Sequence, residues 1–83
     1  MDVLPISPKL ISKIKKYNLE KKFSKQLKLL KANPKHPSLN TELLEPKHHG
    51  IYSFRLDLKF RALFIFRTDK KSIEIIQVTV HYK

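Results

Sequence analysis

Three consecutive strand-like runs in the C-terminal third of the chain limit its possible folds more than any other feature. They follow Gly50, the single glycine, and read IYSFRL, FRALFIFR and SIEIIQVTV, separated only by DLK and TDKK. Runs rich in aromatic and β-branched residues with short polar connections predict an antiparallel meander. Because side chains alternate between the two faces of a strand, Phe54 faces one side of this sheet while Ser53 and Arg55 face the other. One face is therefore apolar enough to receive helices, and the other mixes apolar and basic residues.

The N-terminal half has the periodicity of two helices. Ser7 can cap the free N–H groups of the first helix, and Pro8 suits its first position because the missing N–H would have no helical partner. Asn18 interrupts the pattern, and Asn33 before Pro34 ends it. The apolar positions at helical spacing are Leu10, Ile11, Ile14, Tyr17, Leu19, Phe23, Leu27 and Leu30. The pattern predicts a hairpin of two basic amphipathic helices.

Together the two halves predict one domain over residues 1–83, of the α/β (α+β) class, with the helical hairpin packed on one face of an antiparallel sheet. The strand residues expected beneath the helices are Tyr52, Phe54, Phe64 and either Ile75 or Ile76. The segment before Gly50 reads as a loop with a short strand at residues 41–44. Residues 1–6 could add an edge strand, although Pro5 disfavours one.

The composition excludes several classes of protein. The absence of cysteine rules out disulfides and thiolate metal sites. No apolar run approaches the ~20 residues that a membrane span needs, and the N-terminus lacks the basic start and apolar length of a signal peptide. We therefore expect a cytoplasmic protein with no membrane partner.

Positive charge is concentrated in the predicted helices. The chain has 18 Lys and Arg against 7 Asp and Glu, a formal charge of +11, and ten lysines lie between Lys9 and Lys35 against one acid, Glu20. Such a charge attracts polyanions over long range, which indicates nucleic acid or an acidic protein as the partner. The alternative is a lysine-rich surface that reflects genome composition only.

Two arginines in the predicted hairpin carry the strongest sign of chemistry. If DLK is a three-residue loop, Arg55 and Arg61 lie directly opposite each other, with both side chains on one face of the sheet. Like charges so placed are unfavourable unless an anion lies between them, and guanidinium groups match phosphate oxygens in bidentate fashion. The alternative is that both arginines reach carboxylates, with Glu42, Glu45 and Asp57 as the candidates.

A histidine and a tyrosine follow the third strand. Because the meander returns this strand beside the second, His81 could approach Arg61. An imidazole that titrates near neutral pH and two fixed cations would suit the cleavage of a phosphodiester. The alternative is that His81 and Tyr82 are surface residues without chemistry.

Several motifs occur in an order that resembles the RelE/ParE superfamily of type II toxins. HPSLNTELL is similar to the family's His-Pro-Ser-Leu motif, GIYSFR to its Gly-aromatic-Ser-x-Arg motif and FRALF to its Tyr-Arg-hydrophobic motif. The resemblance covers nearly the whole chain and implies a RelE-like fold. It also implies an enzyme, because the RelE and YoeB branches enter the ribosomal A site and cleave mRNA without a metal, with the substrate's 2′-hydroxyl as nucleophile.

The resemblance implies roles for individual residues. Arg61 matches the family's catalytic arginine, and Arg55 matches the arginine one strand earlier. His81 and Tyr82 are similar to the His and Tyr that close the last strand of YoeB-like toxins. The general base of that branch is matched by Glu45, with Glu42 in second place, and His81 is the other candidate for the base.

The resemblance also implies partners. A protein on ribosomal RNA would use lysines for sequence-independent, salt-sensitive affinity. The candidates for RNA binding are Lys9, Lys13, Lys21, Lys25 and Lys28. The implied partners are the ribosome, mRNA and a cognate acidic antitoxin, in a homodimer or a toxin–antitoxin heterotetramer.

No metal or other cofactor is expected. The four histidines, His36, His48, His49 and His81, lack a metal-ligand spacing, and no glycine-rich phosphate loop occurs. Two other readings use the same scaffold, namely a ParE-like poison of DNA gyrase and a catalytically inactive RelE-fold binding protein. A plain nucleic-acid-binding module is a further alternative.

Overall fold

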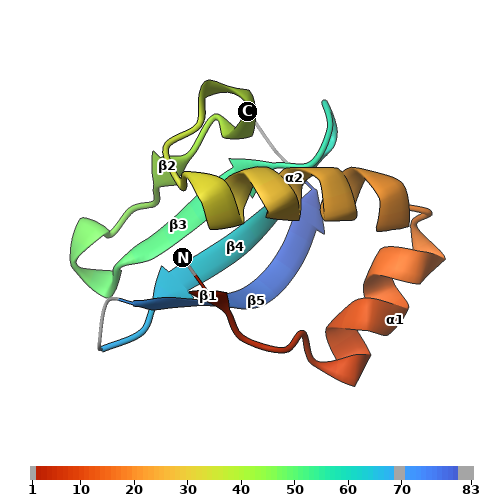
Figure 1. The fold of residues 1–83 in the computed structure, drawn as a ribbon, viewed down its shortest axis with the longest axis horizontal. Coiled ribbons are helices and arrows are strands. Elements are labelled where there is room, and N and C mark those ends of the chain that lie inside the picture. The colour runs from red at the N-terminus through yellow and green to blue at the C-terminus, as the bar shows by residue number, and fades with distance from the viewer. Residues whose placement is uncertain (1, 69–70, 81–83) are drawn as a thin grey trace.

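The computed structural model describes residues 2–68 and 71–80. Within them, two helices lie on a five-stranded mixed sheet with the order β1-β5-β4-β3-β2 (Figure 1). The elements are β1 (Asp2–Val3), α1 (Pro8–Lys16), α2 (Glu20–Ala32), β2 (Glu42–Leu43), β3 (Ile51–Arg55), β4 (Phe60–Phe66) and β5 (Ser72–Val80), with 3₁₀ turns at Pro37–Leu39 and Lys47–His49. The predicted α+β class, with a helical pair on a sheet, is confirmed.

The two helices begin and end where the sequence predicts. The Ser7 hydroxyl accepts a hydrogen bond of 3.2 Å from the N–H of Leu10, and Pro8 occupies the first turn of α1. Asn18 separates the helices in the left-handed conformation, with φ 55°, which asparagine tolerates better than most residues. The extended backbone of Asn33 ends α2.

The three long strands form the predicted antiparallel meander. Arg55 lies opposite Arg61, so the predicted register of the β3–β4 hairpin is confirmed. A bulge beside Leu63 shifts the register between β4 and β5, so that Phe64 lies opposite Ile75. As a result Ile75 is buried, whereas Ile76 is 37% exposed.

The sheet is not purely antiparallel, which corrects the prediction. Strand β1 forms at the edge and pairs with β5 in parallel, with Asp2 opposite Ser72 and Val3 opposite Ile73. Pairing is compatible with Pro5 because the strand ends before the residue that lacks an N–H. At the other edge β2 falls within the predicted range and pairs with β3.

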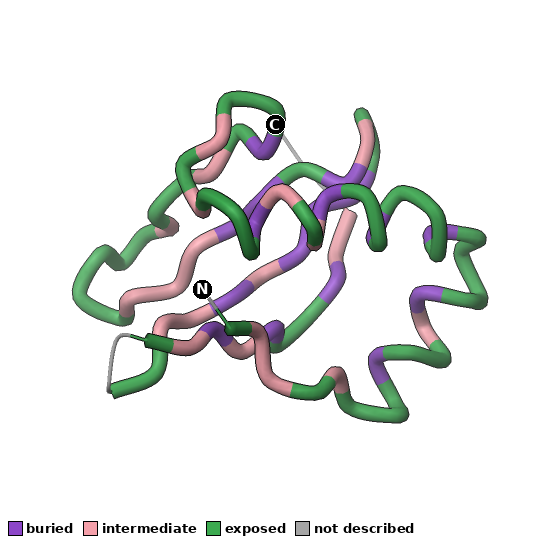
Figure 2. The backbone as a smooth tube through the Cα atoms, in the orientation of Figure 1, coloured by how far each residue is buried: buried purple, intermediate pink, exposed green. Residues whose placement is uncertain are grey.

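The core lies between α2 and the central strands, where buried positions of both meet (Figure 2). Phe54 and Phe64 are fully buried. Five of the predicted helical positions are buried, namely Leu10, Ile14, Leu19, Phe23 and Leu30, and Leu27 is partly buried. In Figure 1, α2 crosses in front of the sheet, so the face that carries Phe54 and Phe64 is the one covered by helices.

Gln26 and Leu39 lie in the interior, although the sequence patterns did not predict either as a core residue. Gln26 is 7% exposed, and its side-chain amide donates to the carbonyl of Arg55 at 2.7 Å and to that of Ser38 at 3.1 Å. Leu39, in the turn after α2, is fully buried. The amide of Gln26 therefore holds the end of β3 and the turn at Pro37–Leu39 to the same helix.

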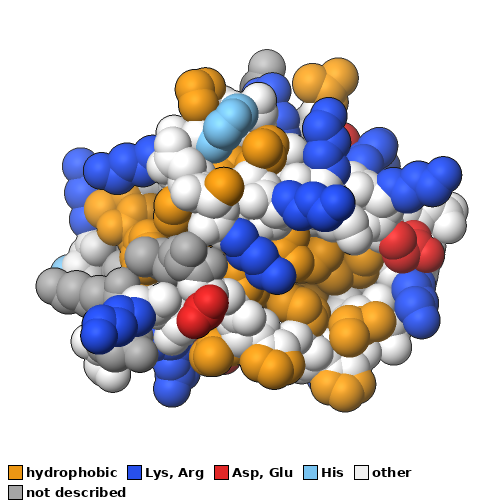
Figure 3. All heavy atoms as spheres, in the orientation of Figure 1, with side chains coloured by type: hydrophobic (Ala, Val, Ile, Leu, Met, Phe, Trp, Pro, Cys, Tyr) orange, Lys and Arg blue, Asp and Glu red, His pale blue; other side chains and the backbone are white. Residues whose placement is uncertain are grey.

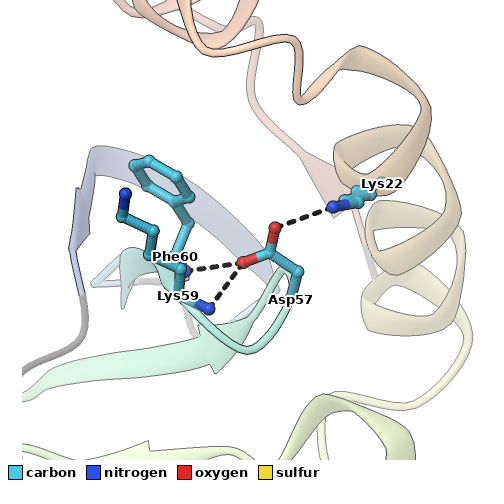
Figure 4. A network of polar contacts seen from close by, with 4 residues as sticks. All are labelled: Lys22, Asp57, Lys59 and Phe60. Carbon is cyan, nitrogen blue, oxygen red and sulfur yellow. Dashed lines mark hydrogen bonds and ion pairs between the residues drawn. The ribbon is translucent and has the colours of Figure 1, made fainter.

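Asp57 organises the turn between β3 and β4 and joins it to α2 (Figure 4). One carboxylate oxygen accepts from the N–H groups of Lys59 and Phe60, at 2.8 and 2.7 Å, and the other accepts from Lys22 at 2.8 Å. Partial burial acts to raise the pKa of Asp57, but these hydrogen bonds and the charge of Lys22 outweigh it, so the pKa is lowered. Asp57 therefore stabilises the fold in its ionised form.

Candidate functional site

The two arginines of the β3–β4 hairpin lie on the sheet face that α2 does not cover. They alternate along their strands with the buried Phe54 and Ala62, so their side chains start on the opposite face. Thr79 of β5 lies opposite Arg61, which makes a row of three residues across the sheet. The predicted pairing of the two cations is thus present in the backbone.

Arg61 is 4% exposed and bonded to protein on two sides. Its Nε donates to the hydroxyl of Ser53 at 3.0 Å, and one terminal nitrogen donates to the carbonyl oxygens of Asn40 at 2.5 Å and Ser53 at 3.4 Å. Burial lowers the pKa of Arg61, Glu42 acts to raise it and the like charge of Arg55 lowers it further. The guanidinium remains charged at physiological pH, because an arginine does not lose its proton in proteins.

Arg55 has the opposite environment. It is exposed at the end of β3, and its guanidinium forms no hydrogen bond or ion pair with the residues that the structure describes. Its backbone carbonyl is fixed by Gln26. Within the described residues, Arg55 therefore has an anchored backbone and side-chain donors without a partner, whereas Nε and Nη2 of Arg61 are engaged.

The carboxylates of the described residues form no ion pair with Arg55 or Arg61. Across residues 2–68 and 71–80, the ion pairs at short distance are Lys22–Asp57 and Arg67–Glu74, and neither includes Arg55 or Arg61. The alternative in which both arginines reach carboxylates is therefore wrong for these residues. Glu42 acts on Arg61 through its charge alone.

Glu45, the predicted base, is exposed and lies two residues beyond the end of β2. The peptide bond that joins it to Pro46 is cis. Its carboxylate is accessible to solvent. A role as the base stays a prediction.

His81 and Tyr82 lie outside the described residues. The strand before them runs beside β4 as predicted, with Val80 opposite Phe60. Their position relative to the two arginines, and their roles as acid or base, stay predictions.

Ser53 and Asn40 are the residues of this site that sequence reasoning missed. Ser53 is 1% exposed, and Asn40 has a left-handed backbone with φ 48° that turns its carbonyl toward Arg61. A lone serine on the arginine face of an apolar strand was the available signal for Ser53. No local pattern indicates that the turn carrying Asn40 approaches β4.

The predicted RNA-binding lysines lie on two surfaces. Lys9 and Lys13 line an open groove of about 460 Å³ between α1 and β5, where Lys13 donates to the side chain of Gln77 at 3.1 Å. A second group on the outer side of α2 consists of Lys21, Lys25 and Lys28. Figure 3 shows basic side chains spread over the helical side of the molecule with few acidic ones between them. RNA binding by these lysines stays a prediction.

Residues 2–68 and 71–80 contain no cluster of three or more His, Cys, Asp or Glu side chains that could hold a metal ion. In the same part of the chain, no helix has the length and apolar character of a membrane span.

No family model matches the sequence, and no curated protein matches it. Solved structures do match. A YoeB/ParE toxin from Agrobacterium tumefaciens superposes with a TM-score of 0.74 at 17% identity, over 99% of this chain and 100% of that one. A YoeB–YefM complex from Staphylococcus aureus superposes with a TM-score of 0.70 at 22% identity, over 99% of this chain and 98% of that one. A YoeB dimer from the same organism superposes with a TM-score of 0.65 at 22% identity, over 98% of this chain and 94% of that one.

These similarities define the class of fold. Two helices on a five-stranded sheet, matched from end to end, are the α+β fold of the YoeB/ParE toxins. The RelE-like fold implied by the sequence motifs is therefore confirmed.

Proposed function

We propose that this chain belongs to the RelE/ParE superfamily and is the toxin of a type II toxin–antitoxin system, acting as a ribosome-dependent, metal-independent mRNA endoribonuclease. The observation that carries the proposal is the arginine pair in register on the sheet face that α2 does not cover. The end-to-end similarity to YoeB toxins supports it. The enzyme would act in the cytoplasm, where it meets translating ribosomes and mRNA.

The chemistry would be an internal transfer at one phosphodiester. Glu45 or His81 removes the proton of the 2′-hydroxyl, whose oxygen attacks the adjacent phosphorus. The bond to the 5′-oxygen breaks, and His81 or Tyr82 donates the proton that this oxygen needs to leave as a hydroxyl. The products are a 2′,3′-cyclic phosphate and a 5′-hydroxyl, and no water or metal is consumed.

The two arginines have unequal parts in this mechanism. Arg55, exposed and without a partner in the described residues, would bind the phosphate and stabilise the negative charge that develops on it. Arg61 would add its positive charge from beneath, with Nε and Nη2 held by Ser53 and Asn40 and Nη1 without a hydrogen bond to the described residues. We infer that Arg55 makes the first contact with the substrate.

The proposed partners follow from the charge and from the matched complexes. Solved structures of the same fold are YoeB–YefM complexes, one described as heterotetrameric, and a YoeB dimer. With a net charge of +11, this chain would bind an acidic antitoxin in a similar assembly, or pair with itself. Lysines on α1 and α2 would supply affinity for ribosomal RNA.

The test is cleavage of mRNA on purified ribosomes. The intact chain should produce 5′-hydroxyl ends on ribosomes kept assembled by Mg²⁺, with no other metal added. Arg55→Ala should lower the rate by roughly 10²–10³-fold, since removing one preformed donor to a transition state typically costs that much. Arg67→Ala is the matched control, because Arg67 is an exposed arginine that pairs with Glu74 at 2.6 Å.

Two results would count against the proposal. Growth arrest with intact mRNA and broken DNA would favour a gyrase poison. Tight binding of a partner without either activity would favour an inactive binding protein.

A further inference from the structure

A pocket with aromatic walls lies at the end of α2, away from the arginine pair. This aromatic pocket has a volume of about 330 Å³. It is lined by Asn33, Pro34, Lys35, Thr41, Tyr52 and Phe66. An adjoining hollow of about 390 Å³ shares three of them and adds His36, Pro37, Asn40 and Leu43. Tyr52 alternates with Ser53 along β3, so the pocket lies on the face opposite Arg61.

The walls of the aromatic pocket are rings that are already packed edge to face. Tyr52 and Phe66 have centroids 5.2 Å apart at 82°, and Tyr52 stacks on the buried Phe64 at 5.4 Å. A further ring in the pocket would extend this cluster in the geometry that aromatic pairs prefer. At about 330 Å³, the pocket is at the small end of ligand sites, which suits one large side chain.

The polar groups around the pocket are mostly engaged within the chain. The hydroxyl of Thr41 donates to the carbonyl of Pro34 at 2.7 Å, and the side-chain oxygen of Asn33 accepts from the N–H of Lys35 at 3.1 Å. The ring nitrogen Nδ1 of His36 accepts from the N–H of Ser38. A nucleobase needs free donors and acceptors along its edge, and this arrangement offers few. An apolar side chain needs none.

The charge around the pocket selects the partner. Lys35 is exposed at its rim and forms no ion pair with residues 2–68 and 71–80. A second copy of the chain carries the same +11 charge, so an acidic segment complements this rim better than a second copy does. Figure 3 shows apolar side chains exposed at the left of the view with basic side chains beside them, which is the side of the end of α2. An acidic segment complements both features.

We propose that the aromatic pocket binds an aromatic side chain from an acidic peptide segment of a partner protein, with Lys35 pairing a neighbouring carboxylate. The proposal rests on the proposed function only for the source of that segment, which would be the antitoxin. It adds an anchoring point that is separate from the arginine face.

The experiment uses the intact chain labelled with ¹⁵N and defined acetylated, amidated peptides. Glu-Trp-Glu should shift the backbone amide signals of Lys35, Thr41, Tyr52 and Phe66 in a saturable way. Glu-Ala-Glu should bind roughly tenfold more weakly, because it lacks the anchoring ring. Lys-Trp-Lys should also bind more weakly, because its charge is reversed.

Matched charge reversals locate the site. Lys35→Glu should weaken Glu-Trp-Glu roughly threefold to fivefold, whereas Lys28→Glu, on the outer side of α2, should change the affinity by less although it alters net charge equally. Both positions are exposed, so both variants should fold.

Four results would overturn the proposal. The first is that Glu-Trp-Glu shifts no amide signal, and the second is that the two variants weaken its binding equally. The third is that AMP shifts the same amide signals at a lower concentration than the peptide does. The fourth is that these signals shift with protein concentration when no peptide is present. The third would indicate a nucleotide site, and the fourth a contact between copies. None depends on mRNA cleavage, so a chain that binds the peptide but leaves mRNA intact would refute the proposed function and not the pocket.

Discussion

Replacement of Arg61 by alanine should destabilise the fold, whereas replacement of Arg55 should not. Arg61→Ala removes three hydrogen bonds and leaves the hydroxyl of Ser53, at 1% exposure, without its donor. A buried polar group that loses its partner costs about 1–3 kcal/mol, and bonds to a charged group contribute more than neutral ones. Asn40 is exposed, so water can replace the guanidinium at its carbonyl. The alanine variant also no longer buries a charged group, and this partly offsets the loss of stability.

The expected sum is about 2–4 kcal/mol, out of the ~5–15 kcal/mol typical of a small domain. Arg55→Ala should change the free energy of unfolding by less than about 0.5 kcal/mol, because its side chain is exposed. Urea unfolding followed by circular dichroism measures both values. Hydrogen exchange at the amides of Leu39 and Asn40, which close the turn on His36 and Pro37, should accelerate in Arg61→Ala only.

An unchanged urea midpoint for Arg61→Ala would refute this reasoning and show that the bonds of Arg61 are not structural. If the destabilisation is found, a loss of cleavage in Arg61→Ala cannot be assigned to chemistry alone. The activity of Arg55→Ala would then be the cleaner measure of phosphate binding.

Phe23→Ala should lower the free energy of unfolding by about 3–5 kcal/mol, since residue 23 is only 7% exposed and its ring packs in the core. A decrease of less than about 1 kcal/mol in urea unfolding would contradict the packing of α2. Folding lowers the pKa of Asp57, so its carboxylate stabilises the fold at pH values above the pKa of about 4 of an unfolded aspartate. This stabilisation is lost as the pH falls through the lower pKa that Asp57 has in the folded protein. Asp57→Asn should therefore reduce stability at pH 7 and reduce the loss below pH 4, measured by thermal unfolding against pH. His81→Gln should slow mRNA cleavage roughly 10²-fold or more with ribosome binding retained; full-rate cleavage would exclude it as a proton-transfer group.

Local sequence signals determined the helices, the three long strands and the pairing of Arg55 with Arg61. Ser7 with Pro8, and Asn18 between the helices, act within a few residues of themselves, so the helix limits could be predicted. The alternation after Gly50 and the short DLK loop set the strands, and the loop length placed Arg55 opposite Arg61. The type of fold and the candidate cations therefore followed from the sequence.

The tertiary structure decided everything that depends on distant segments. The parallel pairing of β1 joins the first strand to the start of β5, the last strand that the structure describes, and no local pattern encodes such a contact. Gln26 reads as an ordinary polar helical position, yet it is buried because the carbonyls of Ser38 and Arg55 converge on it. Likewise, nothing in the sequence indicates that Arg61 is buried while Arg55 is exposed. Only the approach of Asn40 and Ser53 makes it a buried, bonded group, because burial and hydrogen bonding are properties of the assembled neighbours and not of the residue.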